Sequence, residues 1–301
     1  MSPSFLSPQL RAELALVLVT FIAASGWIFS KETLDGMPPW LFIGIRFSLA
    51  GIVLLFAGYR YWSLLSSVTN IKHCVQLGLV MAVAMLFWIL GLHHGTHMGE
   101  GAFITSLGAV MVPLVGRLFF GERPPLSTWS AIPLAVAGLA CLSLEGGFQF
   151  EIGQIYFLSA AVLFAVHFSL VSRAAVSMPA IMLTAVQLIV VGIVSLTVSA
   201  FMEEWPSSFS TSIWGWLLAS ALIATSLRFF LQTYGQGLTP ASHAALIMVL
   251  EPIWTAILAL IWFGERMQGL QALGCFLIFA ALLISRWRWI QKLVRAMGTK
   301  G

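Results

Sequence analysis

Long, uninterrupted apolar runs restrict what this chain can fold into more than any other feature. A helix needs roughly 20 mostly apolar residues to cross a bilayer, and the strands of a membrane β-barrel alternate polar and apolar residues, which these runs do not. The sequence therefore predicts an all-α membrane protein with ten transmembrane helices. The runs lie at about 12–30, 40–58, 74–92, 101–120, 129–144, 155–171, 180–201, 213–232, 244–263 and 270–285.

The composition excludes the other broad classes of protein. Charged residues make up 9% of the 301 residues, against about 25% in a soluble domain. The hydrophobic fraction of 59% is too high for a disordered chain. The loops between the runs leave no room for a soluble domain. We therefore expect the lipid bilayer as a partner and a bacterial inner (cytoplasmic) membrane as the location, with no nucleic acid bound.

The distribution of lysine and arginine predicts the orientation of the chain. If the N-terminus is cytoplasmic, 11 of the 15 basic residues fall on the inner side, and only Lys31 and Arg266 fall in outer loops. Basic residues favour the cytoplasmic side, so both termini are expected there. Residues 291–301 form a basic tail that favours anionic lipid. The first run is interpreted as a retained helix because no basic segment precedes it.

A short motif reveals an internal repeat. Phe120-Gly121-Glu122-Arg123 recurs 143 residues later as Phe263-Gly264-Glu265-Arg266. The two halves, residues 10–146 and 151–290, then hold five predicted helices each. Because five is odd, the second half enters the membrane from the opposite side. The sequence thus predicts two inverted five-helix repeats, an architecture of many secondary transporters.

The chain resembles the EamA-type ten-helix members of the drug/metabolite transporter superfamily. Three stretches carry the resemblance: Phe103 to Arg123, Leu250-Glu251-Pro252-Ile253 through Gly264-Glu265-Arg266, and the first run with Trp27 and Lys31. The resemblance implies an exporter of small organic metabolites such as amino acids, aromatic compounds, nucleosides or drugs. The Glu251-Pro252 pair has no counterpart in the first half, where Gly108-Ala109 align, so the halves differ in mid-membrane.

Two ionisable residues inside runs are the leading candidates for substrate binding, because charges in a bilayer are costly. Glu251, followed by Pro252, either binds a substrate ammonium, carries a proton, or stabilises a break in the helix. Arg228 either binds a substrate carboxylate or pairs structurally with Glu251. A cation beside a carboxylate favours an amino acid as substrate, moved by alternating access through a central cavity.

Further polar and aromatic side chains lie inside runs and have two interpretations each. Trp27 and Trp88 either line an apolar cavity or pack between helices. His167, Gln187 and Gln232 either bind substrate or make hydrogen bonds in the core.

Arg46 lies about six residues from the outer end of its run. We expect its long side chain to extend to the membrane interface.

The remaining motifs point away from enzyme chemistry. No phosphate-binding glycine-rich loop is present, so the chain is not driven by its own ATP hydrolysis. His93 and His97 are spaced to share a helical face with a metal, yet they lie with His94 at a helix end, where loop structure explains them. We expect no enzyme activity, cofactor or metal site, and a monomer. A passive channel, or a membrane metal enzyme using His93 and His97, are the alternatives.

Overall fold

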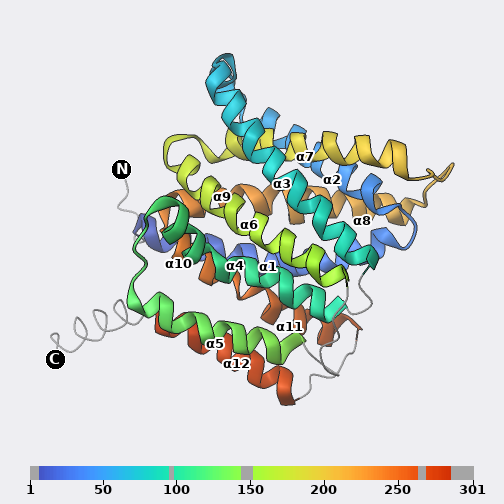
Figure 1. Ribbon diagram of the computed structural model, residues 1–301. Helices are drawn as coiled ribbons and strands as arrows, with labels where there is room; N and C mark the ends of the chain where they lie inside the picture. The colour runs from blue at the N-terminus through green and yellow to red at the C-terminus, as the bar shows by residue number, and fades with distance from the viewer. Residues whose placement is uncertain (1–6, 95–97, 144–151, 264–268, 286–301) are drawn as a thin grey trace.

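The computed structural model describes residues 7–94, 98–143, 152–263 and 269–285, and every regular element in these ranges is a helix (Figure 1). The first half contains α1 (Pro8–Leu34), α2 (Pro39–Ala57), the 3-10 helix η1 (Tyr59–Ser66), α3 (Val68–His94), α4 (Met98–Phe120) and α5 (Leu126–Ser143). The second half contains α6 (Ile152–Ser177), α7 (Ala180–Met202), α8 (Thr211–Ala221), the π-helix η2 (Leu222–Leu227), α9 (Arg228–Leu238), α10 (Ala241–Met248), α11 (Glu251–Phe263) and α12 (Gly269–Ser285).

The helices have the length and composition of an integral membrane protein. Seven segments are long and apolar enough to cross a bilayer: Pro8–Leu34, Pro39–Ala57, Val68–Gly91, Ile152–Ser177, Ala180–Met202, Thr211–Leu238 and Ala241–Trp262. Three apolar helices are shorter: Ile104–Phe120, Leu126–Cys141 and Gly269–Ser285. Each of these segments overlaps one of the ten apolar runs. The all-α membrane class is thereby confirmed, and the count of ten membrane crossings stays a prediction.

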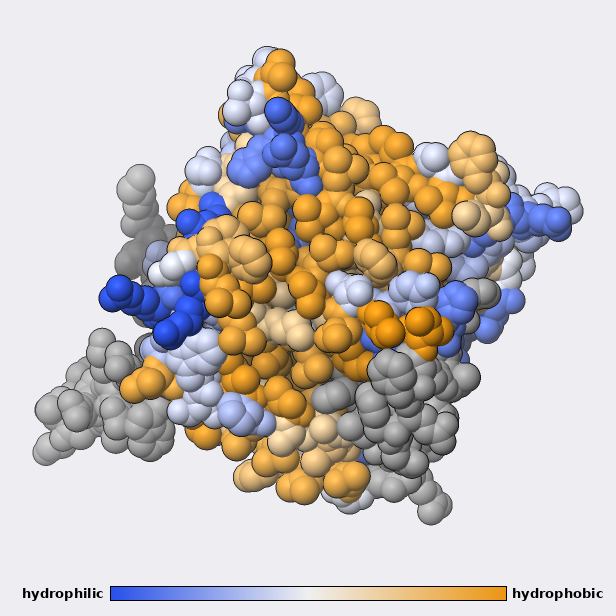
Figure 2. All heavy atoms as spheres, in the orientation of Figure 1, coloured by the Kyte–Doolittle hydropathy of each residue, from blue (hydrophilic) through white to orange (hydrophobic). Residues whose placement is uncertain are grey.

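The surface of the helices is apolar, as contact with lipid requires. Figure 2 shows hydrophobic side chains covering the middle of one face, with hydrophilic groups gathered toward its edges. Large apolar side chains are exposed on helices from both halves, among them Leu118, Phe201, Ile261 and Phe276. In water such a surface would associate, so the expected environment is the hydrocarbon core of a bilayer.

Helices α2 and α7 pack against each other in opposite directions. A Cβ added to Gly44 would lie 2.6 Å from Leu196 Cγ, and a Cβ added to Gly51 would lie 2.7 Å from Ile189 Cγ1. The residue numbers rise along α2 as they fall along α7, so the pair is antiparallel. Glycine permits this close approach of two backbones.

The contact between α2 and α7 occurs twice, once with the glycine on α2 and once with the glycine on α7. Gly51 faces Ile189, and Gly192 faces Ser48, whose backbone nitrogen would lie 2.6 Å from an added Cβ. Gly51 and Gly192 are 141 residues apart, and so are Ser48 and Ile189. The two helices are thus related by a local two-fold pseudosymmetry, which is the packing expected of an inverted repeat.

The first copy of the Gly-Glu-Arg motif forms the turn after α4. Gly121 has a φ of 64°, a conformation that glycine adopts without strain. The turn brings Glu122 Oε1 within 3.1 Å of Arg173 Nη1 on α6, and the Arg173 guanidinium lies 4.5 Å from the centre of the Phe120 ring. The motif therefore connects the end of α4 to α6. Residues 264–266 of the second copy lie outside the described ranges.

The run at 244–263, predicted as one helix, is divided in two. Helix α10 ends at Met248, Val249 and Leu250 form a turn, and α11 begins at Glu251. Pro252 has no backbone N–H to donate and clashes with the preceding turn of a continuous helix, but it fits the first turn of a new one. The prediction of a single helix is wrong here, and the break places Glu251 at a helix start.

Candidate functional site

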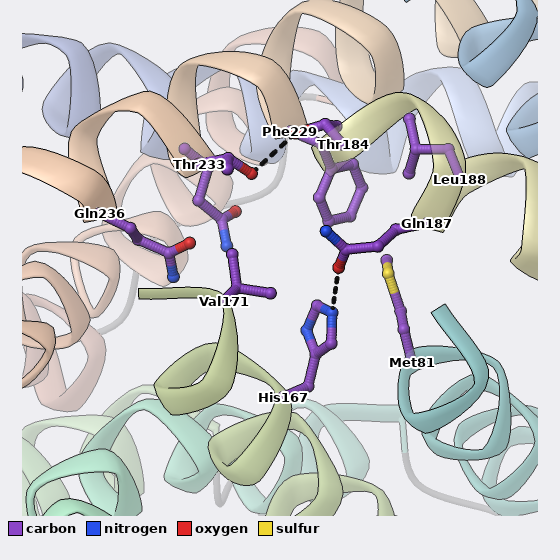
Figure 3. Close-up of a pocket in the computed structure, with 10 residues that line it drawn as sticks. Met81, His167, Val171, Thr184, Gln187, Leu188, Phe229, Thr233 and Gln236 are labelled. Atoms are coloured by element: carbon purple, nitrogen blue, oxygen red, sulfur yellow. Dashed lines mark hydrogen bonds between the residues drawn. The ribbon is translucent and has the colours of Figure 1, made fainter. Parts of the chain in front are cut away.

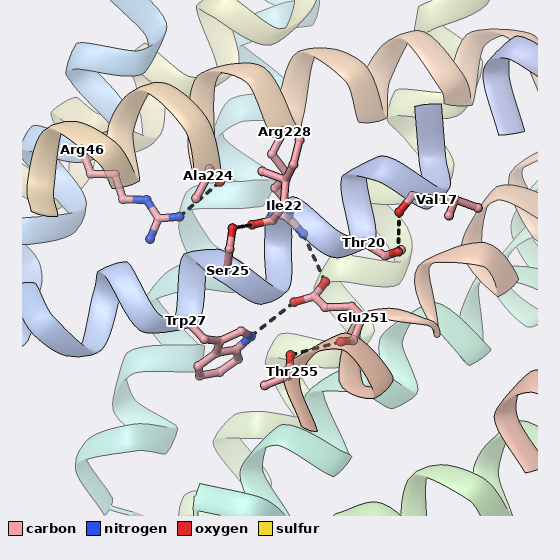
Figure 4. Close-up of polar contacts among 10 residues, drawn as sticks. All are labelled: Val17, Thr20, Ile22, Ser25, Trp27, Arg46, Ala224, Arg228, Glu251 and Thr255. Atoms are coloured by element: carbon pink, nitrogen blue, oxygen red, sulfur yellow. Dashed lines mark hydrogen bonds and ion pairs between the residues drawn. The ribbon is translucent and has the colours of Figure 1, made fainter. Parts of the chain in front are cut away.

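Arg228, Glu251 and Trp27 meet in the interior of the bundle (Figure 4). Arg228 Nη2 on α9 lies 3.6 Å from Glu251 Oε2 on α11. The Trp27 indole N–H on α1 donates to Glu251 Oε1 at 3.3 Å. The Arg228 and Glu251 side chains keep 19% and 24% of their surface exposed. The two side chains are therefore partly exposed, although their residues lie well inside apolar segments.

The chain places both charges at interruptions of helix geometry. Glu251 is the first residue of α11, where the partial positive charge of a helix N-terminus stabilises a carboxylate. Arg228 follows directly on the π-helix η2, and single π-helical turns occur often at functional sites. Thr255 Oγ1 donates to the Glu251 carbonyl at 3.0 Å, the bond to the carbonyl four residues earlier that threonine often makes inside a helix. Local helix irregularity thus positions the pair.

An aromatic wall lies beside the ion pair. The rings of Trp27 and Trp88 are 6.2 Å apart between centroids, at an interplanar angle of 64°. The Arg228 guanidinium lies 4.4 Å from the centre of the Phe229 ring, a cation–π distance. Together these groups offer an anion-binding group, a cation-binding group and an apolar surface. The structure brings four of the predicted residues, Arg228, Glu251, Trp27 and Trp88, into one cluster.

His167, Gln187 and Gln232 form a separate, smaller site (Figure 3). His167 Nε2 on α6 lies 2.7 Å from Gln187 Oε1 on α7, and Gln187 Nε2 donates to the Leu183 carbonyl at 2.8 Å. His167 and Gln187 are 8% and 3% exposed. Gln232 borders the same cavity, whose volume of about 10 Å³ has room for about one water molecule. Among the described residues, no hydrogen bond or ion pair joins these three predicted residues to Arg228 or Glu251.

Gln236 lies on the same helix as Gln232 and is not among the predicted site residues. It is 2% exposed, and neither of its amide atoms has a hydrogen-bond partner among the described residues. It borders the small cavity and also a larger one of about 340 Å³, which Glu122 and Arg173 line. Its spacing of four residues from Gln232 on one helix is the signal that could have added it to the predicted site.

The structure contradicts the predicted direction of the Arg46 side chain. Instead of extending to the membrane interface, its side chain turns into the bundle (Figure 4). Nη1 donates to Ser30 Oγ at 3.0 Å, Nη2 donates to the Ala224 carbonyl at 3.3 Å, and Nε donates to Thr225 Oγ1. The physical reason lies in η2, because a π-helical turn changes the backbone hydrogen bonding around Ala224 and leaves its carbonyl within reach.

Some predicted features lie outside what the structure describes. The His97 residue and the side chain of His93 are among them, so the metal alternative is not tested by geometry. The basic tail at 291–301 is another.

The comparisons with known proteins identify the family. The EamA-like transporter family matches this chain twice, over residues 10–144 and 151–287. The two matches correspond to a two-repeat architecture. A crystal structure with 19% sequence identity superposes with a TM-score of 0.78, covering 91% of this chain and 97% of the other, which supports the fold alone.

Curated relatives agree with this assignment. An uncharacterized transporter of Archaeoglobus fulgidus is 28% identical over 92% of this chain and 86% of its own length. A probable amino-acid metabolite efflux pump of Escherichia coli is 24% identical over 90% of this chain and 95% of its own length. The family match covers nearly the whole sequence, as the resemblance of its motifs predicted. This chain is an integral membrane protein that belongs to the EamA-like transporter family.

Proposed function

We propose that the protein is a secondary exporter of small organic metabolites, with amino acids and related amphipathic compounds as substrates. The observation that carries this proposal is the partly exposed Arg228–Glu251 pair, 3.6 Å apart inside the bundle and flanked by Trp27 and Trp88. The names of the relatives, amino-acid metabolite efflux pumps among them, support the same substrate class.

The chemistry of the cluster fits a zwitterion. A substrate carboxylate can replace Glu251 at the Arg228 guanidinium, which binds planar carboxylates through two N–H groups. The substrate ammonium can then take the place of Arg228 beside Glu251 and form an ion pair with its carboxylate. Trp27 and Trp88 offer an apolar surface to the rest of the molecule. Each charged group of the substrate thus replaces one partner of the Arg228–Glu251 ion pair.

Transport by alternating access is the mechanism we propose. Ten helices in two inverted five-helix repeats, with both termini in the cytoplasm, would expose the cluster to each side in turn. The α10–α11 break and the η2 π-helix are the points where rotation of a helix segment costs least, since their backbone hydrogen bonding is already interrupted. Both points adjoin a charged residue of the site.

Counterflow in proteoliposomes tests the function. The amino acid for this test is one that raises the melting temperature of the wild-type protein. Proteoliposomes that contain the wild-type protein are loaded with it in unlabelled form, and entry of the labelled amino acid is followed. A carrier accelerates entry when substrate is present on the far side, and a passive channel does not. Arg228→Ala and Glu251→Gln are expected to abolish counterflow, with Arg60→Ala at the exposed η1 segment as the matched control. Wild-type rates in both site variants contradict the proposed site.

A further inference from the structure

The Arg46 guanidinium has only neutral partners. Its three hydrogen bonds go to Ser30, Ala224 and Thr225, and it lies 5.5 Å and 5.8 Å from the ring centres of Phe42 and Phe47. Among the described residues, no carboxylate lies within ion-pair distance of it. A guanidinium has five N–H groups, so one on each terminal nitrogen remains for another acceptor. A permanent charge inside a membrane protein without a counter-ion is costly.

The charges around the candidate site do not balance. Arg228 and Glu251 neutralise each other, and Arg46 adds a second positive charge that acts on Arg228. The nearest buried carboxylate on α1, Glu13, is directed to His243 at 3.5 Å. It is 14 residues from Trp27, or about 21 Å along a helix. Within the set of Arg46, Arg228 and Glu251, positive charges therefore outnumber negative ones, and the half-buried Glu32 of α1, two residues from Ser30, is not within ion-pair distance of Arg46.

Helix α1 packs closely against η2 beside Arg46. A Cβ added to Gly26 would lie 2.8 Å from Ala224 Cβ and 3.9 Å from Arg46 Nη2, so only a glycine fits between α1, η2 and the Arg46 guanidinium. The next residue, Trp27, donates to Glu251. Figure 4 shows Arg46, Trp27, Arg228 and Glu251 around one stretch of α1. No side chain of residue 26 stands between the Arg46 head group and the neighbouring cluster.

The packing of the fold does not require a charge at this position. The offset of 141 residues that relates α2 to α7 relates Arg46 to Gln187. Gln187 fills the equivalent position with a neutral amide bonded to His167. Since an amide occupies the equivalent position in the second half, packing of this helix pair is compatible with a neutral side chain.

We propose that Arg46 binds an acidic group of the substrate, so that the transported molecule carries a net negative charge. This inference rests on the proposed function. The amino and carboxylate groups of the substrate exchange with Glu251 and Arg228, and a second acidic group occupies the free N–H groups of Arg46. Amino acids and derivatives with a second carboxylate are then preferred over their neutral amides.

Matched pairs of ligands test the proposal. Binding of L-glutamate against L-glutamine, and of L-aspartate against L-asparagine, is measured by thermal shift on the detergent-purified full chain. The variants are Arg46→Gln, which is the residue of the second half, Arg46→Lys, and the control Arg60→Gln. Wild type and control should favour the acidic member of each pair by roughly tenfold or more. Arg46→Gln should lose roughly ten- to a hundredfold for that member and under about twofold for the amide. Arg46→Lys, which keeps the charge without the planar fork, should fall between.

Several outcomes overturn the inference. They are a wild type that binds neither acidic member or shows no preference, an equal change for both members in Arg46→Gln, and an unchanged preference in that variant. A stabilisation by chloride or sulfate alone that depends on Arg46 also overturns it, because the site would then hold a free inorganic ion. The melting temperature without ligand shows whether each variant is folded.

The proposed function can survive the failure of this inference. If Arg228→Ala and Glu251→Gln reduce binding of both members of a pair and Arg46→Gln changes nothing, only the role of Arg46 is wrong. If Arg228→Ala and Glu251→Gln leave binding and counterflow unchanged, the proposed site itself is wrong.

Discussion

Arg46 and Gln187 occupy equivalent positions in the two halves and have opposite surroundings. Both are the eighth residue of their helix, α2 and α7, and these helices are antiparallel. Gln187 is 3% exposed and bonds to His167, so its polar groups are satisfied within the protein. Arg46 is partly exposed and keeps free donors. The difference shows that one packing position can hold a residue whose polar groups are bonded in one half and a residue with spare N–H donors in the other.

Exchanging the residue types at positions 46 and 187 should have the largest effect on folding of all the changes proposed. Gln187→Arg places a charge beside His167 in a site with room for one water molecule and no carboxylate among its described lining residues. An uncompensated buried charge costs several kcal/mol, so we expect little folded protein by size-exclusion chromatography. Arg46→Gln removes a charge and should fold as wild type does. A well-folded Gln187→Arg protein would show that the two positions are equally open.

The Arg228–Glu251 pair allows a sharper separation of stability from transport. Arg228→Met alone leaves Glu251 unpaired and should cost about 2–5 kcal/mol, measured as a lower melting temperature. Adding Glu251→Gln to it removes the orphaned charge and should restore most of that stability. Counterflow should stay abolished in the double variant. Restored counterflow would mean that the pair is a structural contact only, like His167–Gln187.

Changes to the neutral contact between His167 and Gln187 should affect stability and not transport. His167→Phe leaves Gln187 Oε1 without its donor in a buried site, which we expect to cost about 1–3 kcal/mol. His167→Phe combined with Gln187→Leu should cost less than the sum of the two single changes, because they share one hydrogen bond. Melting temperatures give the first result and counterflow the second. Loss of counterflow in a stable double variant would assign these residues to the transport path.

Trp27→Phe should have the smallest effect. The change keeps an aromatic ring beside Trp88 and removes the indole N–H that donates to Glu251. One hydrogen bond to a charged group is worth about 1.5–3 kcal/mol at most, and Arg228 still pairs with the carboxylate. We expect a several-fold loss in substrate affinity by thermal shift and, without ligand, a smaller fall in melting temperature than in His167→Phe, because Arg228 still pairs with the carboxylate. Equal affinity in Trp27→Leu and Trp27→Phe would exclude a role for the ring.

The sequence predicted the candidate site better for charged residues than for neutral ones. Arg228 and Glu251 were found because charges are rare in apolar runs, and the structure brings them together. Gln236 was not distinguished from other glutamines, since an amide is tolerated in a helix whether or not it has a partner. The direction of the Arg46 side chain was predicted wrongly, because its distance from the end of the run does not show that η2 leaves the Ala224 carbonyl within its reach.

The sequence by itself determined the class of the protein, its helical segments and its family. These follow from local properties, namely the length of each apolar run and the repeated Phe-Gly-Glu-Arg motif. Only the tertiary structure decided which residues meet. The α2–α7 contact and the hydrogen bond between Trp27 and Glu251, which are 224 positions apart, depend on residues distant in the sequence. The length of an apolar run determines that a helix crosses the bilayer. Packing against other helices sets the rotation of that helix about its axis, and the rotation decides which polar groups meet in the interior.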